Sequence, residues 1–540
     1  MFVSVLKKPD SVYGTTEKTA YRFEEKKNFC NVNFDYKVEN GCAKVIIYPS
    51  GEPVKYIKFR FRSDFSLVDK VYGDYWGRSS YLVPLEWKNV MPERVMPWYC
   101  YLLQGDKMHC YGVKTGADCF ACWFVDAKGI TLFLDLSNGS GGTDLKEPLL
   151  ACEVAELEGQ AGEPTYNVAQ RFCKILCDSP KMPLEPIFGV NNWYWAYGNI
   201  SKETALKETD YLMEMTKGVK HRPYMIIDDG WQKHHRIKSD LNYNGGEWLP
   251  NQKFGDMKDL VDKINAKGAK AGLWFRPLLT REDLPDEQIL TEGNGGKILD
   301  PSHPENLKKI QADTERIRSW GFELIKHDFS QIDMFGAMRD NPEINDDLKQ
   351  FSKKRVFYDK TKTNATIIKN LYKAIEKGAG GADVIGCNVF GHLSAGIHSI
   401  QRIGNDTSGQ TFEITRSDGI NSALRLPQNK NFYLADPDCA AFTDMVDAEL
   451  NLDFLEMCAI TGMTALASVT PGILTDGEMK RINAIFKLAD QNTGDYGIKN
   501  YEKNNCPDSF INPEGKEINY DWYRCYDGVR VKFDWTETNE

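Results

Sequence analysis

Two carboxylates that follow apolar runs are the residues of this chain best suited to chemistry. Lys326, His327 and Asp328 close one such run, and Arg402 stands four residues before Asp406 at the end of another. Alternate residues of a strand point to the same side, so Lys326 and Asp328 would face a common space. A neighbouring ammonium keeps a carboxylate ionised, and an ionised carboxylate can act as a nucleophile.

These carboxylates allow two interpretations. An aspartate that follows a strand often caps the next helix, which would give both residues a structural role. Two carboxylates at the ends of separate strands are also typical of glycoside hydrolysis, in which they flank the scissile bond. The elements that carry the two residues help to separate these interpretations.

Composition and charge limit the classes of protein. A chain of 540 residues is too long for one core and predicts two or three domains. Hydrophobic residues at 41% and charged residues at 27% are typical of a globular protein. A net charge of -10 without a basic cluster argues against a nucleic-acid partner. No apolar run is long enough to span a membrane, so no membrane partner is expected.

The cysteines predict a reducing compartment. None of the 14 shows the spacing of a disulfide framework, and many lie in apolar runs. We therefore expect free thiols and a cytoplasmic location; a periplasmic or secreted location is the alternative if a signal peptide was removed. Cys119 and Cys122 have no second pair at zinc-like spacing, and His234 and His235 are better explained as a solvated loop. No metal is expected.

The pattern of apolar and turn residues divides the chain into three segments. Residues 1–180 contain short strand-like runs between turn-rich stretches, which predicts a β-sandwich domain with a linker helix over residues 166–178. Residues 181–490 alternate apolar runs with amphipathic stretches of helical length, which predicts a catalytic barrel. Residues 491–540 predict a short C-terminal β-module.

Eight βα repeats in the second segment predict a (β/α)8 barrel, an α/β fold. The expected strands are residues 187–193, 224–229, 269–275, 322–328, 383–388, 397–404, 432–436 and 463–469. The expected helices are residues 202–217, 256–267, 305–320, 363–377, 447–460 and 477–490. A doubly wound open sheet is the alternative, but the glycine-rich nucleotide turn that it would need is missing. No organic cofactor is expected.

Active sites of such barrels lie at the C-terminal ends of the strands, and polar or aromatic residues gather at six of the eight expected ends. These residues are Trp193, Asp228, Asp229, Trp231, Trp274, Arg276, Lys326, Asp328, Arg402, Asp406, Asp436 and Asp438. Carboxylates accept hydrogen bonds from vicinal hydroxyls, arginine and lysine donate them, and tryptophan stacks on the apolar face of a sugar. The set therefore favours a sugar-binding site over helix capping alone.

With these motifs the chain resembles the retaining α-galactosidases of the melibiase type, glycoside hydrolase families 36 and 27. The resemblance covers about residues 186–475, and the N-terminal β-domain is similar to the family 36 arrangement. It implies that the Lys-x-Asp pattern carries the nucleophile, that the Asp-Asp-Gly-Trp pattern binds sugar hydroxyls, and that the Arg-x-x-x-Asp pattern supplies the acid/base. The corresponding residues are Lys326, Asp328, Asp228, Asp229, Trp231, Arg402 and Asp406, and Asp436 and Asp438 resemble a family 27 motif.

The chain departs from the families at three places. His327 stands where they usually have an aromatic residue between the lysine and the nucleophile. The expected fifth strand, with Cys387 and Asn388, matches neither signature, although this region of the families recognises the sugar around its 2-position. The C-terminal segment is shorter than the usual sandwich.

The resemblance implies an exo-acting hydrolase that releases terminal α-linked galactose from an oligosaccharide or glycoside by double displacement, with Asp328 as nucleophile and Asp406 as acid/base. The two carboxyl groups of a retaining enzyme should lie about 5–5.5 Å apart. We expect Lys326 to hold the pKa of Asp328 low, and burial and the nearby negative charge to raise the pKa of Asp406.

Other activities stay open. An α-N-acetylgalactosaminidase, a β-L-arabinopyranosidase or a galactosyl transferase would use the same catalytic residues on another sugar or acceptor. A carbohydrate-binding barrel without catalysis and a barrel isomerase are alternatives from a different functional class. A binding protein would not need both Asp328 and Asp406. The sequence leaves open the preferred sugar and linkage, hydrolysis against transglycosylation, and whether the chain forms a homo-oligomer.

Sugar orientation gives one more expectation. Asp228 and Asp229 are adjacent, so both can reach one ligand only if the strand stops at or just after Ile227. Both would then accept hydrogen bonds from O4 and O6, with Trp193 and Trp231 as walls of the site and Lys326 and Arg402 as donors to the other hydroxyls. The alternative is that Asp229 caps the following helix.

Overall fold

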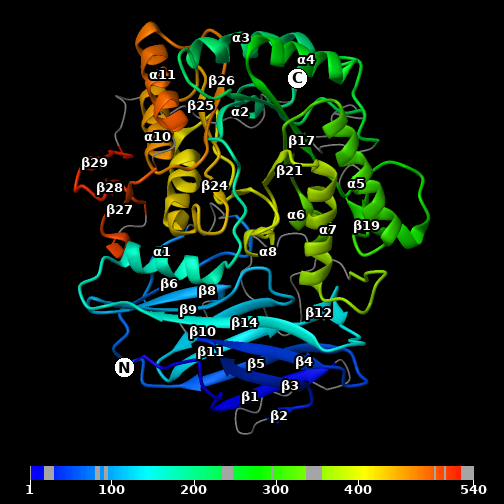
Figure 1. Ribbon diagram of the computed structural model, residues 1–540, viewed down its shortest axis with the longest axis vertical. Coiled ribbons are helices and arrows are strands. Elements are labelled where there is room, and N and C mark those ends of the chain that lie inside the picture. The colour runs from blue at the N-terminus through cyan, green and yellow to red at the C-terminus, as the bar shows by residue number, and fades with distance from the viewer. Residues whose placement is uncertain are drawn as a thin grey trace.

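The computed structural model has a β-rich part at one end of the molecule and a barrel at the other (Figure 1). Helix α1 (Thr165–Leu176) lies between the two parts, and a small sheet stands beside the barrel. The structure describes residues 2–16, 29–78, 85–89, 95–233, 247–293, 296–335, 355–491, 494–503 and 506–523.

The N-terminal part is a sandwich of two six-stranded sheets, with the orders β2-β1-β5-β11-β10-β7 and β3-β4-β14-β9-β8-β6. The strands are β1 (Ser11–Thr16), β2 (Phe29–Cys30), β3 (Asn33–Glu39), β4 (Cys42–Tyr48), β5 (Val54–Arg62), β6 (Lys70–Gly73), β7 (Met96–Pro97), β8 (Tyr99–Gln104), β9 (Lys107–Val113), β10 (Phe120–Asp126), β11 (Gly129–Asp135) and β14 (Leu149–Glu158). In β5, Phe59 and Phe61 are buried while Arg60 and Arg62 face outward, because alternate side chains point to opposite faces. The predicted sandwich is confirmed.

Helix α1 connects the sandwich to the barrel. It starts one residue earlier than the expected linker helix, and it also ends two residues earlier. Val168, Phe172 and Leu176 recur every four residues on one face and are all buried. This face packs against β9 and β14 of the sandwich and against a segment of the barrel, so α1 belongs to the cores of both parts.

The barrel is one sheet of nine strands in the order β24-β23-β22-β21-β17-β16-β15-β26-β25, and every neighbouring pair is parallel. The strands are β15 (Phe188–Asn191), β16 (Tyr224–Ile227), β17 (Lys270–Phe275), β21 (Leu324–His327), β22 (Asp383–Gly386), β23 (Ile400–Arg402), β24 (Leu434–Asp436), β25 (Cys439–Phe442) and β26 (Ala465–Val469). Ile226, Leu324, Ile385 and Leu466 belong to one buried cluster inside the ring. The predicted (β/α)8 barrel is confirmed.

The seventh strand is broken, which the sequence did not predict. Its first half, β24, pairs with β23 on one side, and its second half, β25, pairs with the eighth strand, β26, on the other side. Pro437 and Asp438 lie between the halves, and Asp438 has a φ of 80°. The break turns the Asp438 side chain toward the polar end of the barrel, where it contacts Arg402.

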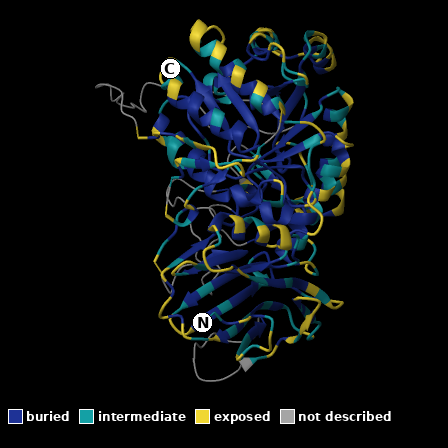
Figure 2. Cartoon of the chain, turned by 60° about the vertical axis from the view of Figure 1, so that its left-hand side comes forward, coloured by how far each residue is buried: buried dark blue, intermediate teal, exposed yellow. Residues whose placement is uncertain are grey.

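Helices cover the outside of the barrel. They are α3 (Lys202–Met215), α4 (Met257–Lys267), α5 (Pro304–Ser319), α7 (Asn364–Ala379), α10 (Ala448–Ile460) and α11 (Asp476–Gln491), close to the six expected ranges. Ser201, Asp256, Thr363 and Asp447 cap four of them by accepting hydrogen bonds from backbone N–H groups of the first turn. Figure 2 shows buried strands inside and exposed residues on the outer helix faces.

Short segments follow several strands at the end of the barrel where chemistry is expected. They are α2 (Trp193–Ala196) after β15, α6 (Ser330–Phe335) after β21 and α8 (Gly391–Ser394) after β22. The long loop after β17 contains a small sheet of β18 (Leu279–Thr280), β19 (Ile289–Gly293) and β20 (Gly296–Leu299). After β23, three short helical segments replace one regular α-helix: α9 (Phe412–Ile414), the π-helix η2 (Thr415–Ile420) and the 3-10 helix η3 (Asn421–Gln428).

The C-terminal segment contains a three-stranded sheet of β27 (Gly497–Ile498), β28 (Ser509–Ile511) and β29 (Glu517–Asn519). It stands beside α10, and the Tyr520 hydroxyl donates to Glu456 of that helix at 3.5 Å. Residues 524–540 of the expected C-terminal β-module and the pair His234 and His235 lie outside the described residues.

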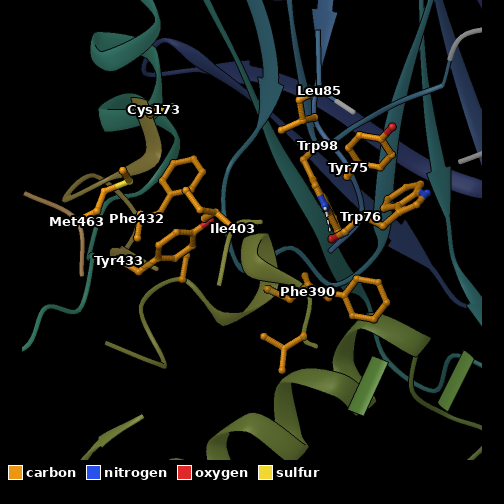
Figure 3. Close-up of a cluster of buried hydrophobic side chains, with 14 of the residues drawn as sticks. Tyr75, Trp76, Leu85, Trp98, Cys173, Phe390, Ile403, Phe432, Tyr433 and Met463 are labelled. Carbon is orange, nitrogen blue, oxygen red and sulfur yellow. Dashed lines mark hydrogen bonds between the residues drawn. The ribbon is translucent and has the colours of Figure 1, made fainter. Parts of the chain in front are cut away.

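An apolar cluster joins the sandwich to the barrel, as Figure 3 shows. Tyr75, Trp76 and Trp98 come from the sandwich, and Phe390 and Phe432 come from the barrel. These large aromatic side chains leave water almost completely, and such burial is the main favourable contribution to packing.

A buried ion pair lies beside this cluster. The Arg425 Nε donates to Asp74 Oδ1 at 2.6 Å, and the Gln428 side chain donates to Asp74 Oδ2 at 2.9 Å. The pair and the cluster together fix residues 74–78 of the sandwich against the barrel.

No helix of the described residues combines the length and apolarity that crossing a membrane requires. In the same part of the chain, no three His, Cys, Asp or Glu side chains gather closely enough to hold a metal ion.

Replacing Asp74 by alanine should lower the free energy of unfolding by about 3–5 kcal/mol, because it leaves the Arg425 guanidinium buried without its carboxylate. Chemical denaturation measures the change. Replacing Lys258, whose ion pair with Asp262 is exposed, is the control and should cost less than about 0.5 kcal/mol. Equal effects of the two substitutions would show that the junction does not depend on the buried pair.

Candidate active site

Lys326 and Asp228 form a buried ion pair at the C-terminal ends of β21 and β16. The Lys326 Nζ donates to Asp228 Oδ2 at 2.7 Å, and the Asn191 side chain donates to the same oxygen at 2.7 Å. Burial works against the charge of Lys326, but the Asp228 carboxylate and the other negative groups of the site together outweigh it and raise the pKa of the ammonium well above its usual value. The site therefore contains a permanent positive charge.

Asp328 lies one residue beyond the end of β21 and is 6% exposed. The Trp274 indole Nε1 donates to its Oδ2 at 2.9 Å, and the Asn388 side chain donates to its Oδ1 at 2.6 Å. Burial alone would raise the pKa of Asp328, but the charges of Lys326 and Arg78 and these hydrogen bonds lower it. The expected direction of this pKa is confirmed.

Asp229 lies beyond the end of β16, as the sequence predicts. Strand β16 ends at Ile227, and a turn rather than a helix follows over residues 229–233. The Gln232 side chain donates to Asp229 Oδ1 at 2.5 Å. The alternative that Asp229 caps a helix is therefore wrong. Gly230, at a φ of 127°, allows the turn, because a Cβ there would lie 2.6 Å from the Gly198 carbonyl oxygen.

Asp406 lies at the mouth of the site, and its side chain is 47% exposed. Arg78 of the sandwich donates to its Oδ1 at 2.5 Å, and Arg402 donates to the same oxygen at 3.2 Å. Desolvation favours a higher pKa, but the charges of the two guanidinium groups outweigh it and hold the pKa of Asp406 well below its usual value. The expectation of a raised pKa is therefore wrong for this structure, because the sequence did not place Arg78 here.

Arg402 supports the loop that carries Asp406. Its Nη2 contacts the Asp438 carboxylate and donates to the Asn405 carbonyl at 2.9 Å, and Asp438 also accepts a hydrogen bond from the Thr407 N–H at 2.9 Å. Arg402 is 1% exposed. Its Nη1 lies 3.5 Å from the Cys387 sulfur, and burial raises the pKa of that thiol, so Cys387 is neutral at this point of the site.

Arg276 forms a buried ion pair with a residue that sequence reasoning missed. Its Nε and Nη2 donate to Asp333 of α6 at 3.0 and 2.5 Å, and its guanidinium lies 4.1 Å from the centre of the Phe329 ring. Phe329 has a φ of 65° and directly follows the carboxylate at 328. Arg276 therefore supports the turn after β21.

The tryptophans of the site have different roles. Trp231 is 0% exposed, packs against Trp248 and Trp320, and donates from its indole to the Trp274 carbonyl at 2.9 Å. The expectation that Trp231 is a wall of the sugar site is therefore wrong for this structure, since its ring is fully buried among other tryptophans and has no surface open to a ligand. Trp193, at the start of α2, is only half-buried and keeps ring surface available.

His327 points away from the site toward α7. Its Nδ1 lies 3.3 Å from the Nε2 of His398, whose Nδ1 lies 3.3 Å from Glu376, and its Nε2 contacts the Ser330 hydroxyl. Burial lowers the pKa of both imidazoles, so they are neutral. His327, which replaces the aromatic residue usual in the families, therefore lies on the outer face of β21 and does not line the site.

The structure of the whole chain is similar to solved structures of α-galactosidases. An α-galactosidase of Thermus thermophilus, solved with p-nitrophenyl α-D-galactopyranoside, has a TM-score of 0.59 at 16% identity and covers 90% of this chain and 95% of that chain. A GH36 α-galactosidase of Geobacillus stearothermophilus has a TM-score of 0.58 at 13% identity, covering 94% of this chain and 77% of that chain. The chain thus has the sandwich-and-barrel fold of a class of α-galactosidases.

A relative by sequence supports the same fold. The bifunctional α-galactosidase/sucrose kinase of Mediterraneibacter gnavus is 24% identical over 181 residues, which are 31% of this chain and 18% of that protein. The galactosidase domain of an α-galactosidase-sucrose kinase has a TM-score of 0.57 at 14% identity and covers 89% of this chain and 70% of that chain. No family model matches the chain.

Replacing Lys326 by methionine should lower the free energy of unfolding by about 3–5 kcal/mol, because Asp228 is then buried without its ammonium. Denaturation at several pH values measures this loss, which should shrink as the pH falls and the unpaired carboxylate takes up a proton. The double variant Lys326→Met, Asp228→Asn removes both charges and should be more stable than the single variant at neutral pH. A double variant that is no more stable would contradict the ion pair.

Proposed function

We propose that the chain is a retaining exo-acting glycoside hydrolase that releases terminal α-linked galactose by double displacement. Asp328 is the nucleophile and Asp406 the acid/base. The observation that carries the proposal is the state of Asp328, a buried carboxylate kept ionised beside Lys326 and oriented by Trp274 and Asn388. The reaction needs neither a metal nor an organic cofactor.

The first step is attack by the Asp328 carboxylate on the anomeric carbon. The glycosidic bond breaks, and Asp406 in its protonated form gives a proton to the leaving oxygen. Trp274 and Asn388 hold the nucleophile without reorganisation, which favours the transition state.

The second step hydrolyses the galactosyl–aspartate ester. Asp406 takes a proton from a water molecule, the water oxygen attacks the anomeric carbon, and Asp328 leaves as a carboxylate. The exposure of Asp406 supports this role, because its side chain must exchange protons with water and with the leaving group. The expected separation of about 5–5.5 Å between the two carboxyl groups stays a prediction.

Recognition of galactose rests on the pair Asp228 and Asp229. Both lie beyond the end of β16, from where their carboxylates can accept hydrogen bonds from O4 and O6. Lys326 donates to a further hydroxyl, and the half-buried ring of Trp193 faces the apolar side of the sugar. The α-galactosidase of Thermus thermophilus was solved in complex with p-nitrophenyl α-D-galactopyranoside and with stachyose, which are ligands of this chemistry.

Other sugars and acceptors fit the same machinery. An α-N-acetylgalactosaminidase, a β-L-arabinopyranosidase or a galactosyl transferase differs only in groups around the sugar or the acceptor. A panel of nitrophenyl glycosides, with and without a sugar acceptor, separates these activities. We also propose a cytoplasmic location, which the thirteen cysteines with free thiols among the described residues support.

Replacing Asp328 by asparagine should lower kcat by at least about 10³-fold with an α-galactoside, because the nucleophile is lost while the fold is kept. Steady-state kinetics with folding checked by circular dichroism measures this. In Asp328→Gly, which leaves the space of the carboxylate empty, added azide should restore turnover and give β-galactosyl azide. Replacing Asp406 by alanine is the matched control, for which azide should give the α-azide. Retained activity of Asp328→Asn would contradict the proposed nucleophile.

Replacing Asp229 by alanine should reduce the preference for α-galactosides over α-glucosides as well as the rate. In the unaltered protein, a bound glucoside leaves the buried Asp229 carboxylate without the hydroxyl that a galactoside supplies, which weakens binding of the glucoside. Asp229→Ala has no carboxylate there and therefore loses this discrimination. The ratio of kcat/KM for the two nitrophenyl sugars measures the preference, with Lys258→Ala, at an exposed position, as the control. Full discrimination by Asp229→Ala would make Asp229 a structural residue.

A further inference from the structure

A buried carboxyl group near Asp406 is not used by the mechanism above. Asp418 belongs to η2, in the irregular loop after β23, and is 1% exposed. Neither of its carboxyl oxygens has a hydrogen-bond partner within the described part of the chain, and the same holds for the side-chain oxygen and nitrogen of Asn421, one turn later. Buried polar groups without partners are rare and indicate a ligand, a water or a change of state.

The segment with Asp418 lies directly against the loop that carries Asp406. A Cβ at Gly404 would lie 2.7 Å from the Asp418 carbonyl oxygen, and one at Gly419 would lie 2.9 Å from Thr407. The residues on both sides of Asp406 therefore pack on this turn.

The charges around Asp418 determine its protonation. Burial raises the pKa of its carboxyl to about 8, Asp406 and Asp438 act in the same direction, and Arg78 and Arg402 oppose them. At neutral pH Asp418 is therefore protonated, while Asp406, paired with Arg78, is ionised. The two carboxyl groups hold one proton between them, and it is on the buried Asp418 rather than on the exposed Asp406.

We propose that Asp418 is a positioning residue for acid catalysis, because it takes over the Arg78 guanidinium from Asp406 when substrate occupies the site. This proposal rests on the proposed function. Before the exchange Arg78 is paired with Asp406 and Asp418 is protonated; afterwards Arg78 is paired with ionised Asp418 and Asp406 is protonated. Asp418 gives one proton to water, and the exposed Asp406 takes one up, so charge and protons balance.

Arg78 is suited to such an exchange. Its Nε has no hydrogen-bond partner among the residues that the structure describes, so the guanidinium has a donor for a second acceptor. Its backbone is held by the junction beside Asp74 and Trp76, so that the side chain can move while the main chain stays in place. In the proposed exchange, the leaving group of the substrate enters at the contact between Arg78 and Asp406 and separates them.

The test compares two leaving groups, because only a poor one needs acid assistance. Replacing Asp418 by asparagine should lower kcat/KM for methyl α-galactoside by about 10²-fold, the usual contribution of general acid catalysis. For p-nitrophenyl α-galactoside, whose phenolate leaves without a proton, the loss should stay below about tenfold. Asp418→Glu keeps a carboxyl group and should restore the ratio of the two rates toward that of the unaltered protein.

A matched control is Glu208→Gln. Glu208 is also buried, burial raises its pKa to about 8, and it accepts a hydrogen bond from Trp195, but it lies on α3 and does not face Arg78. Its replacement should change the two rates by the same factor. If Asp418→Asn does not fold, Asp418→Ser, which leaves room for a water, gives the same comparison.

The pH profile and a second variant test the exchange itself. The basic limb of kcat/KM for methyl α-galactoside should move to lower pH in Asp418→Asn, because Asp406 then stays with Arg78 and loses its proton at low pH. In an Arg78→Met background Asp406 is released, so that adding Asp418→Asn should cost less than about tenfold with methyl α-galactoside.

The outcomes are distinct. Equal losses on both substrates, or a loss of about 10²-fold that persists in Arg78→Met, would overturn the role of Asp418 and leave the hydrolase intact. If the unaltered protein cleaves neither substrate, the proposed function itself is wrong.

Discussion

The buried ammonium of Lys326 is the charge on which the rest of the site depends. It lies 2.7 Å from Asp228 and outweighs every other charge in keeping Asp328 ionised against burial. Strand β17 separates the strands of Lys326 and Asp228, so the pair forms across the interior of the barrel, where side chains of alternate strands meet in one layer. Without the ammonium, Asp228 would be a buried charge without its counter-ion, which is strongly destabilising, and Asp328 would lose the largest charge that lowers its pKa.

The second positive charge comes from outside the barrel. Arg78 reaches Asp406 because Asp74 is paired with Arg425 and because Trp76 packs in the aromatic cluster at the junction. The sandwich therefore does more than cover the barrel: it supplies a guanidinium that sets the protonation of one of the two carboxyl groups. A barrel with the same strand ends but without this junction would have an Asp406 whose pKa is governed mainly by Arg402 and by desolvation.

Much of the fold could be predicted because local patterns carry it. The eight strands and six outer helices follow from apolar periodicity and capping residues such as Ser201 and Thr363. Contacts between distant segments could not be predicted in this way. Arg78 lies 328 residues before Asp406, and no spacing connects them. The burial of Trp231 follows from its packing on Trp248 and Trp320, which is a tertiary contact without a local signal.

The two carboxyl groups of the proposed mechanism have opposite environments, and this asymmetry supports their assignment. Asp328 is 6% exposed and accepts hydrogen bonds from Trp274 and Asn388, so that it is held ionised in one orientation. The Asp406 side chain is 47% exposed and is paired with the guanidinium groups of Arg78 and Arg402 rather than with neutral donors. A nucleophile gains from a fixed, dry position, whereas an acid/base must exchange protons with the leaving group and with water. Reversing the roles would require a proton to enter and leave the drier of the two positions in every cycle.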